Sequence, residues 1–299
     1  MTGIWLDRPN YSPAPNPFSN GGAIAGPIYT YFTSGGTITP LYFNGDALYA
    51  QNTRFSVYNS GVLTAAKYGN GIGLQAGGIV TNTSSGTISG VSGIEMYANG
   101  SVANLGTIVG VGNFSRAVEL VNGGNVTNGS AAVKSARISG VFEGVDLEGA
   151  GGILVNYGSI TGTYAAVARP GSLVINNKGA SATGAVDGFF VGSYGYPASG
   201  SGTVVNAGFV QATGGGGRGN GIVMNATIAS VTNSGTVMGT GGSGATGLGI
   251  AFNYGGYLLN QQSGLIQGYA AGVSADHGPL TAVNSGSIVG TIAGLRVLS

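Results

Sequence analysis

Residues 284–290 read NSGSIVG, and close variants of this motif return along the chain as NLGTIVG at 104–110, NYGSITG at 156–162 and NSGTVMG at 233–239. Each copy joins an Asn-x-Gly turn to a short aliphatic stretch. Ten asparagines anchor the motif in full or weaker form: Asn59, Asn82, Asn104, Asn128, Asn156, Asn177, Asn206, Asn233, Asn260 and Asn284. The nine steps from the first anchor (59) to the last (284) cover 225 residues, so the mean period is 25.

A second motif, (Gly/Ala)-aliphatic-x-apolar, lies between the anchors. It begins at 71, 93, 117, 144, 188, 221, 247 and 294, with degenerate forms at 165 and 272. Apolar residues alternate with others here and before each anchor, which is typical of strands. We find no 3.6-residue periodicity, and glycine interrupts every window. Three short strands in a unit of about 25 residues predict one rung of a parallel β-helix, or β-solenoid, with about ten rungs.

The anchor asparagines are predicted to stack in a ladder, because identical side chains in register can bond to one another from rung to rung. The ladder residues are Asn59, Asn82, Asn104, Asn156, Asn206, Asn233, Asn260 and Asn284. Asparagine tolerates the left-handed backbone region and glycine adopts it freely, so we expect that conformation at these corners. The alternative is a low-complexity tract without a fold, which regular aliphatic positions argue against.

Composition limits the possible functions. Only 6% of the 299 residues are charged, and glycine contributes 61; ordinary domains are about 25% charged. The net charge of +1 gives no reason to expect nucleic acid or anionic lipid as a partner. The absence of cysteine excludes disulfides and thiol chemistry. No apolar run reaches the roughly 18 residues of a membrane span.

The motifs NSGTVMG, NLGTIVG and NSGSIVG resemble repeats in the passenger regions of bacterial autotransporters and haemagglutinin-like surface proteins, over about residues 59–299. The resemblance implies a right-handed parallel β-helix, an extracellular or cell-surface location, and roles in adhesion or surface structure. Within these 299 residues we expect no copy of that family's translocator.

The N-terminal region differs in composition from the repeats. Six of the nine prolines fall in the first 40 residues, together with many aromatic residues. We predict an arm over residues 1–34, extended and polyproline-like across 11–18, and a β-helix over 35–299. The residues expected to make assembly contacts in the arm are Trp5, Tyr11, Pro13, Pro15 and Phe18.

The motif GLRV, residues 294–297, predicts a last strand with an open edge formed by Gly294, Leu295, Arg296 and Val297. An open edge is a template for pairing with another chain. The arm or initial rung of a second copy is one candidate to cover it, and such a heterologous contact produces filaments. In the other interpretation residues 1–58 cap only their own solenoid.

Three acidic residues occupy the variable position of the second motif on consecutive rungs, Glu95, Glu119 and Asp146. In register, their carboxylates are expected about 5 Å apart. A solvated ladder is the plain interpretation, with Arg116 neutralising part of it. A cation site or a carboxylate pair for glycoside hydrolysis are the alternatives. His277 and the glycine-rich stretch 214–221 are expected to be loops.

Taken together, these patterns predict a secreted structural protein that self-assembles head to tail, with itself as partner. A surface adhesin that binds glycan or host protein is the alternative, and a carbohydrate-active enzyme is a more distant one. We predict no enzymatic activity, no catalytic residue, no metal, no cofactor and no nucleic-acid partner. The expected location is extracellular or on the cell surface.

Overall fold

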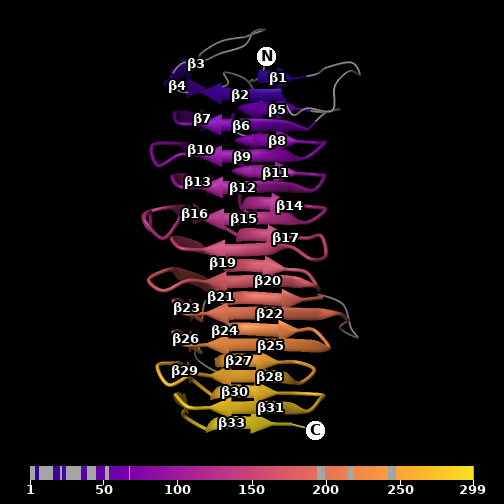
Figure 1. The fold of residues 1–299 in the computed structure, drawn as a ribbon, viewed down its shortest axis with the longest axis vertical. Helices are drawn as coiled ribbons and strands as arrows, with labels where there is room; N and C mark the ends of the chain where they lie inside the picture. The colour runs from indigo at the N-terminus through magenta and orange to yellow at the C-terminus, as the bar shows by residue number, and fades with distance from the viewer. Residues whose placement is uncertain are drawn as a thin grey trace. The chain divides into compact units, whose positions relative to one another are not determined.

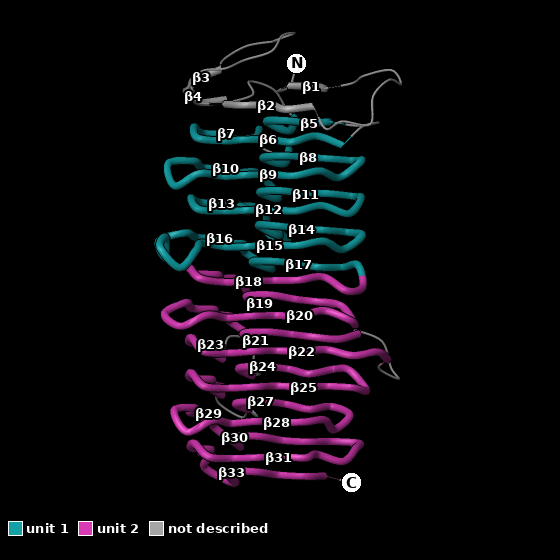
Figure 2. The backbone as a smooth tube through the Cα atoms, viewed as in Figure 1, with its two compact units in different colours: residues 1–149 teal, residues 150–299 magenta. Residues whose placement is uncertain are grey.

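The computed structural model of the chain describes residues 4–6, 16–20, 22–24, 35–38, 45–50, 54–66, 68–193, 199–214, 219–241 and 247–298, with the backbone alone before residue 45. The chain divides into two compact units, residues 1–149 and 150–299 (Figure 2). Each unit is a parallel β-solenoid, described in turn below.

Unit 1 contains four complete turns of three strands each (Figure 1). The turns are β6 (Phe55–Asn59), β7 (Val62–Thr64) and β8 (Ile72–Leu74); β9 (Gly78–Asn82), β10 (Thr87–Gly90) and β11 (Ile94–Met96); β12 (Gly100–Asn104), β13 (Thr107–Gly110) and β14 (Arg116–Leu120); and β15 (Gly124–Asn128), β16 (Arg137–Ser139) and β17 (Glu143–Leu147). The first strands of the turns form one parallel sheet, the asparagine sheet, and the others stack in parallel beside it.

Five short strands precede these turns and pair in parallel with strands of the same unit. β1 (Ile4–Leu6) pairs with β5 (Leu48–Ala50), and β2 (Asn16–Asn20) pairs with β6. β3 (Gly22–Ile24) pairs with β4 (Gly35–Ile38), which pairs with β7. We call the outermost of these strands, β1, β2 and β3, the N-terminal rung. Residues 11–15 of the predicted polyproline-like stretch lie outside the described residues, and 16–18 belong to β2, so the arm boundary at 34 stays a prediction.

Unit 2 contains six turns. The first two are β18 (Ile153–Asn156) with β19 (Ser159–Ala168), and β20 (Ser172–Asn176) with β21 (Ser181–Gly192). The next four are β22 (Ser201–Asn206), β23 (Phe209–Ala212) and β24 (Asn220–Asn225); β25 (Ile228–Asn233), β26 (Thr236–Gly239) and β27 (Leu248–Phe252); β28 (Gly256–Asn260), β29 (Leu265–Gly268) and β30 (Ala271–Ala275); and β31 (Leu280–Asn284), β32 (Ser287–Gly290) and β33 (Ala293–Val297).

These elements confirm the predicted fold class. Four turns in unit 1 and six in unit 2 give the expected ten, and the described residues contain no helix. The long strands β19 and β21 each run through two strand positions without a break, so three separate strands per turn is not universal. No described helix is long and apolar enough to cross a membrane. Right-handed winding stays a prediction.

The core of each turn is built from columns of aliphatic side chains. In unit 1 one column contains Leu63, Ile88, Ile108 and Ile138, all with no exposed surface. These four residues lie on β7, β10, β13 and β16, and each is the register partner of the next. Alternation places every second residue inward, and burying each such side chain contributes roughly 1.5–3 kcal/mol.

The predicted asparagine ladder is present in both units. In unit 1, Nδ2 of Asn59, Asn82 and Asn104 donates to Oδ1 of the next ladder residue, each time at a distance of 2.8 Å. In unit 2, Nδ2 of each ladder residue likewise donates to Oδ1 of the next, at distances of 2.8–2.9 Å, in the order Asn156, Asn176, Asn206, Asn233, Asn260 and Asn284. The anchor predicted at Asn177 is wrong by one residue, because β20 ends at Asn176, and that residue occupies the column.

The expected left-handed conformation is wrong for the ladder asparagines, and it is present at two glycines of the ladder corners, Gly129 (φ 82°) and Gly179 (φ 84°). His277 (φ 54°) is the one described non-glycine residue with positive φ, so every ladder asparagine has negative φ. Glycine follows the asparagine for a steric reason instead. A Cβ on Gly106 would lie 2.2 Å from the carbonyl oxygen of Gly86 in the turn before. Left-handed glycines also occur at the corner before the asparagine sheet, for example Gly77 (φ 70°) and Gly123 (φ 79°).

Candidate functional site

The last turn of unit 2, formed by β31, β32 and β33 and called the terminal turn below, exposes positions that are buried in the turn before it. Leu295 is 47% exposed, whereas its register partner Val273 has no exposed surface. Val297 is 56% exposed above a fully buried Ala275. Because these side chains occupy the inward columns, the terminal turn presents the cross-section of an apolar core.

The terminal turn also has unused hydrogen-bonding capacity. Oδ1 of Asn284 accepts from Asn260 Nδ2 (2.8 Å) and from the Gly286 amide (3.2 Å). Within the described residues, Asn284 Nδ2 has no acceptor. Among the described strands, β31 pairs with β28 alone and β33 pairs with β30 alone. Gly294, Leu295, Arg296 and Val297, the residues predicted for the open edge, all belong to β33.

The N-terminal assembly residues fall mostly outside what the structure describes. Tyr11, Pro13 and Pro15 lie outside the described residues. Trp5 lies in β1 and Phe18 in β2, where the backbone alone is described. Strand β2 pairs with β6 in parallel and has no second described neighbour, so it ends the asparagine sheet of unit 1.

The acidic row of the second motif is the other candidate site, and it lies in unit 1. Register pairs Glu95 of β11 with Glu119 of β14, and Glu119 with Asp146 of β17. The row is not a solvated ladder, however. Glu119 is 7% exposed and Asp146 has no exposed surface. The sequence interpretation failed because it treated the variable position as outward, whereas further charged side chains cover it.

Arg116 lies at the centre of the charged side chains that cover the acidic row. Its Nη1 lies 3.2 Å from Glu119 Oε1, and its Nε lies 2.7 Å from Glu143 Oε2 and 2.8 Å from Asp146 Oδ2. Its Nη2 lies 3.7 Å from Glu148 Oε1. One guanidinium therefore neutralises a single charge among four carboxyl groups.

Glu143 and Glu148 are functional candidates that the sequence reasoning missed. A signal for Glu143 was present, since RAVEL (116–120) and EGVDL (143–147) align with Arg116 opposite Glu143. The seam continues to earlier turns. The Asn70 amide donates to Asp46 Oδ1 (2.7 Å), and Asn70 Nδ2 donates to Glu95 Oε2 (2.5 Å). We call this set the acidic seam: Asp46, Asn70, Glu95, Arg116, Glu119, Glu143, Asp146 and Glu148.

Burial dominates the electrostatics of the acidic seam. It raises the pKa of Glu119 to about 7, although Arg116 acts in the opposite direction. Burial, and then the charge of Glu143, raise the pKa of Asp146 well above its usual range. Burial also raises the pKa of Asp46. A hydrogen bond to Glu95 raises the pKa of Tyr97 to about 12. The seam therefore favours bound protons or another positive charge.

The two remaining features singled out in the sequence are His277 and the glycine-rich stretch 214–221. His277 lies in the loop between β30 and β31, as expected, with its ring centroid 6.1 Å from that of Tyr254. Of the stretch 214–221, residues 215–218 lie outside the described residues, and Asn220 begins β24. Comparison of the chain with protein-family models, curated proteins and solved structures finds no match.

Proposed function

We propose that this chain is a structural protein of the extracellular space or cell surface that associates end to end into a filament or surface matrix. The proposal rests on one observation, the exposed inward side chains of the terminal turn. Covering Leu295 and Val297 removes apolar surface from water, at about 25 cal/mol for each Å².

The proposed occupant of the terminal turn is the N-terminal rung of a second copy. That rung and the terminal turn both consist of strands from parallel sheets. A strand added to an open edge gains backbone hydrogen bonds without changing either fold. Because the two surfaces differ, the contact is heterologous, and repetition gives an open polymer. The arm residues Trp5, Tyr11, Pro13, Pro15 and Phe18 are proposed to strengthen it.

The low charge of the chain supports the same function. With 6% charged residues, copies have little electrostatic repulsion to keep them apart. The resemblance of NLGTIVG and NSGSIVG to autotransporter-type repeats supports an extracellular or cell-surface location. Self-association through the ends leaves the corner loops free.

The test replaces the exposed inward side chains of the terminal turn with lysine. In the variant Leu295→Lys/Val297→Lys, two charges would have to lose their hydration at the joint, so we expect loss of polymers. The measurement is negative-stain electron microscopy, with sedimentation velocity over a range of protein concentrations. The wild-type chain should form filaments, and the variant should remain a single small species.

The matched control is Ile228→Lys, which introduces the same charge at a residue of unit 2 that is 70% exposed and outside the terminal turn. It should polymerise like the wild type. Circular dichroism of all three proteins establishes that the fold is kept. Wild-type protein that stays monodisperse at every concentration, or equal polymerisation of the double variant, contradicts the proposal.

A further inference from the structure

The acidic seam concentrates negative charge in a chain that has little of it. Six of the nine acidic residues belong to the seam: Asp46, Glu95, Glu119, Glu143, Asp146 and Glu148. In unit 2 the register position equivalent to Arg116 and Glu143 is built differently. There Asn220 Nδ2 donates to Asp187 Oδ1 (3.0 Å), and Asn220 Oδ1 accepts from the Leu248 amide (3.2 Å). The charged arrangement is thus specific to unit 1.

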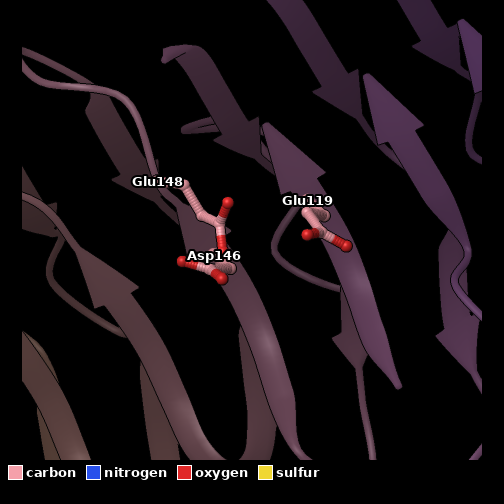
Figure 3. Close-up of side chains that lie close together, drawn as sticks. All are labelled: Glu119, Asp146 and Glu148. Atoms are coloured by element: carbon pink, nitrogen blue, oxygen red, sulfur yellow. The ribbon is translucent and has the colours of Figure 1, made fainter. Parts of the chain in front are cut away.

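Three carboxylates of the seam converge, and we call Glu119, Asp146 and Glu148 the carboxylate triad. One oxygen of each lies within 4.8 Å of an oxygen of the other two. Figure 3 places Asp146 and Glu148 along one stretch of chain and Glu119 on the neighbouring strand. Alternation brings residues 146 and 148 to one face, and the register of β14 with β17 brings Glu119 beside them.

Asp146 gives an independent indication of a ligand. It has no exposed surface, and within the described residues neither of its carboxylate oxygens receives a hydrogen bond. Arg116 Nε lies 2.8 Å from Oδ2, but Nε carries a single hydrogen, which is donated to Glu143 Oε2. Asp146 therefore shares the one guanidinium with three other carboxyl groups, and its burial is costly unless a proton, such as one shared with Glu143, or a cation adds to that charge.

We propose that the carboxylate triad binds a divalent cation, with Ca²⁺ preferred. Ca²⁺ takes oxygen ligands at about 2.3–2.6 Å in flexible geometry, so two oxygens on one ion lie up to about 5 Å apart. Mg²⁺ requires about 2.0–2.1 Å and near-octahedral geometry, which side chains fixed on two paired strands satisfy less readily. Arg116 offsets one charge of the cluster, and the cation offsets two more.

Ion access is provided by Glu148, whose side chain is 29% exposed, whereas those of Asp146 and Glu119 are buried. Water completes the coordination on that open side. The site lies wholly within residues 116–148 of unit 1 and does not depend on the proposed end-to-end association. Failure of either proposal leaves the other intact, because polymerisation and cation binding are measured separately.

The experiment is calorimetric titration of the chelator-treated full chain with CaCl₂ at about pH 8, up to about 10 mM, since oxygen-ligand sites can be as weak as about 10⁻³ M. We expect one site per chain and a rise in melting temperature. Glu148→Gln and Glu119→Gln should each lower the association constant at least about tenfold and abolish the rise. Glu148→Gln alters a partly exposed residue, so misfolding is not an expected explanation.

Glu95→Gln is the matched control, because Glu95 belongs to the same row but not to the carboxylate triad. It should bind Ca²⁺ within about twofold of the wild type, whereas loss of a ligand costs about tenfold or more. Absence of any heat or melting shift means that the cluster holds protons alone, and this overturns the proposal. Wild-type affinity in both triad variants, or tighter binding of Mg²⁺ than of Ca²⁺, also overturns it.

Discussion

Asn104 illustrates at the residue scale why one amino acid recurs every 25 residues. Its Nδ2 lies within hydrogen-bond distance of Gly106 O (3.2 Å), Asn128 Oδ1 (2.8 Å) and Arg137 O (3.1 Å). Its Oδ1 accepts from Asn82 Nδ2 (2.8 Å) and the Gly106 amide (3.2 Å). The asparagine amide places two N–H donors and a separate carbonyl acceptor on a short side chain, so it links two neighbouring turns and its own corner.

Replacing Asn104 with alanine should lower the free energy of unfolding by about 2–4 kcal/mol. Asn82 Nδ2 would lose the nearest of its three acceptors and Asn128 Oδ1 the donor from Asn104, both in fully buried surroundings, where a lost partner costs about 1–3 kcal/mol. Urea unfolding followed by circular dichroism measures the change. Asn125→Ala is the control, because Asn125 is exposed in the same sheet and should change stability by less than about 0.5 kcal/mol. Equal effects in the two variants would refute the structural role of the ladder.

Single residues also mark where sequence reasoning succeeded and where it stopped. The ladder was predictable because Asn59, Asn104 and Asn233 recur in the same motif. The error at Asn177 arose because two adjacent asparagines, 176 and 177, offer two registers, and only the inward alternation of β20 chooses between them. Burial of the acidic row was not predictable from the position of Glu119. It depends on Arg116 and Glu143, whose side chains meet across two turns.

At the scale of the strand and its corner, close stacking explains the glycine of the Asn-x-Gly motif. A Cβ on Gly106 would lie 2.2 Å from Gly86 O and 2.3 Å from Thr83 O. Equivalent contacts recur at Gly208, Gly235 and Gly286. At these four glycines the neighbouring corners therefore approach too closely for a side chain.

Gly106→Ala should destabilise unit 1 by about 1–3 kcal/mol, because the backbone of one corner must move away from the next. Thermal unfolding measures the effect. Gly112→Ala tests the mechanism, since the nearest atom to its Cβ is a movable methyl group of Val91 at 3.0 Å. We expect its cost to be less than half that of Gly106→Ala. A neutral Gly106→Ala would show that the corners have room to adjust.

The strand pattern itself was predictable from alternation, as at residues 94–96 and 295–297. Continuity of β19 and β21 was not, because TGTYAAVA and TGAVDGFF contain the same glycine and alanine residues that form bends in other turns. Whether the backbone bends there depends on the neighbouring turn and not on local composition.

At the scale of the whole molecule, the acidic seam makes stability depend on pH. The pKa of Glu119 is raised from its ordinary 4.5 to about 7 in the folded state. Between these values the folded chain keeps a proton that the unfolded chain has released, so the free energy of unfolding falls as the pH rises. Asp146, whose pKa is also raised, acts in the same direction and extends the range upward.

In the presence of a chelator, the free energy of unfolding should therefore decrease by roughly 3 kcal/mol for Glu119 alone from about pH 4.5 to pH 7.5, since each pKa unit corresponds to about 1.4 kcal/mol. Urea unfolding at several pH values measures the slope. Glu119→Gln should flatten it, because glutamine does not titrate. A free energy of unfolding that rises with pH over this range would contradict the buried, protonated state of the seam.

The asparagine ladder has one more consequence for an assembly of this chain. In both units each amide passes its N–H toward the asparagine nearer the C-terminus, from Asn59 to Asn82 and from Asn260 to Asn284. The column of each unit therefore has a direction: its side-chain oxygens face the preceding turn and its N–H groups face the following turn. Two C-terminal faces brought together would oppose donor to donor, whereas copies in the same orientation continue the sequence. Any fibre grown through this column is polar, and its two tips should elongate at unequal rates.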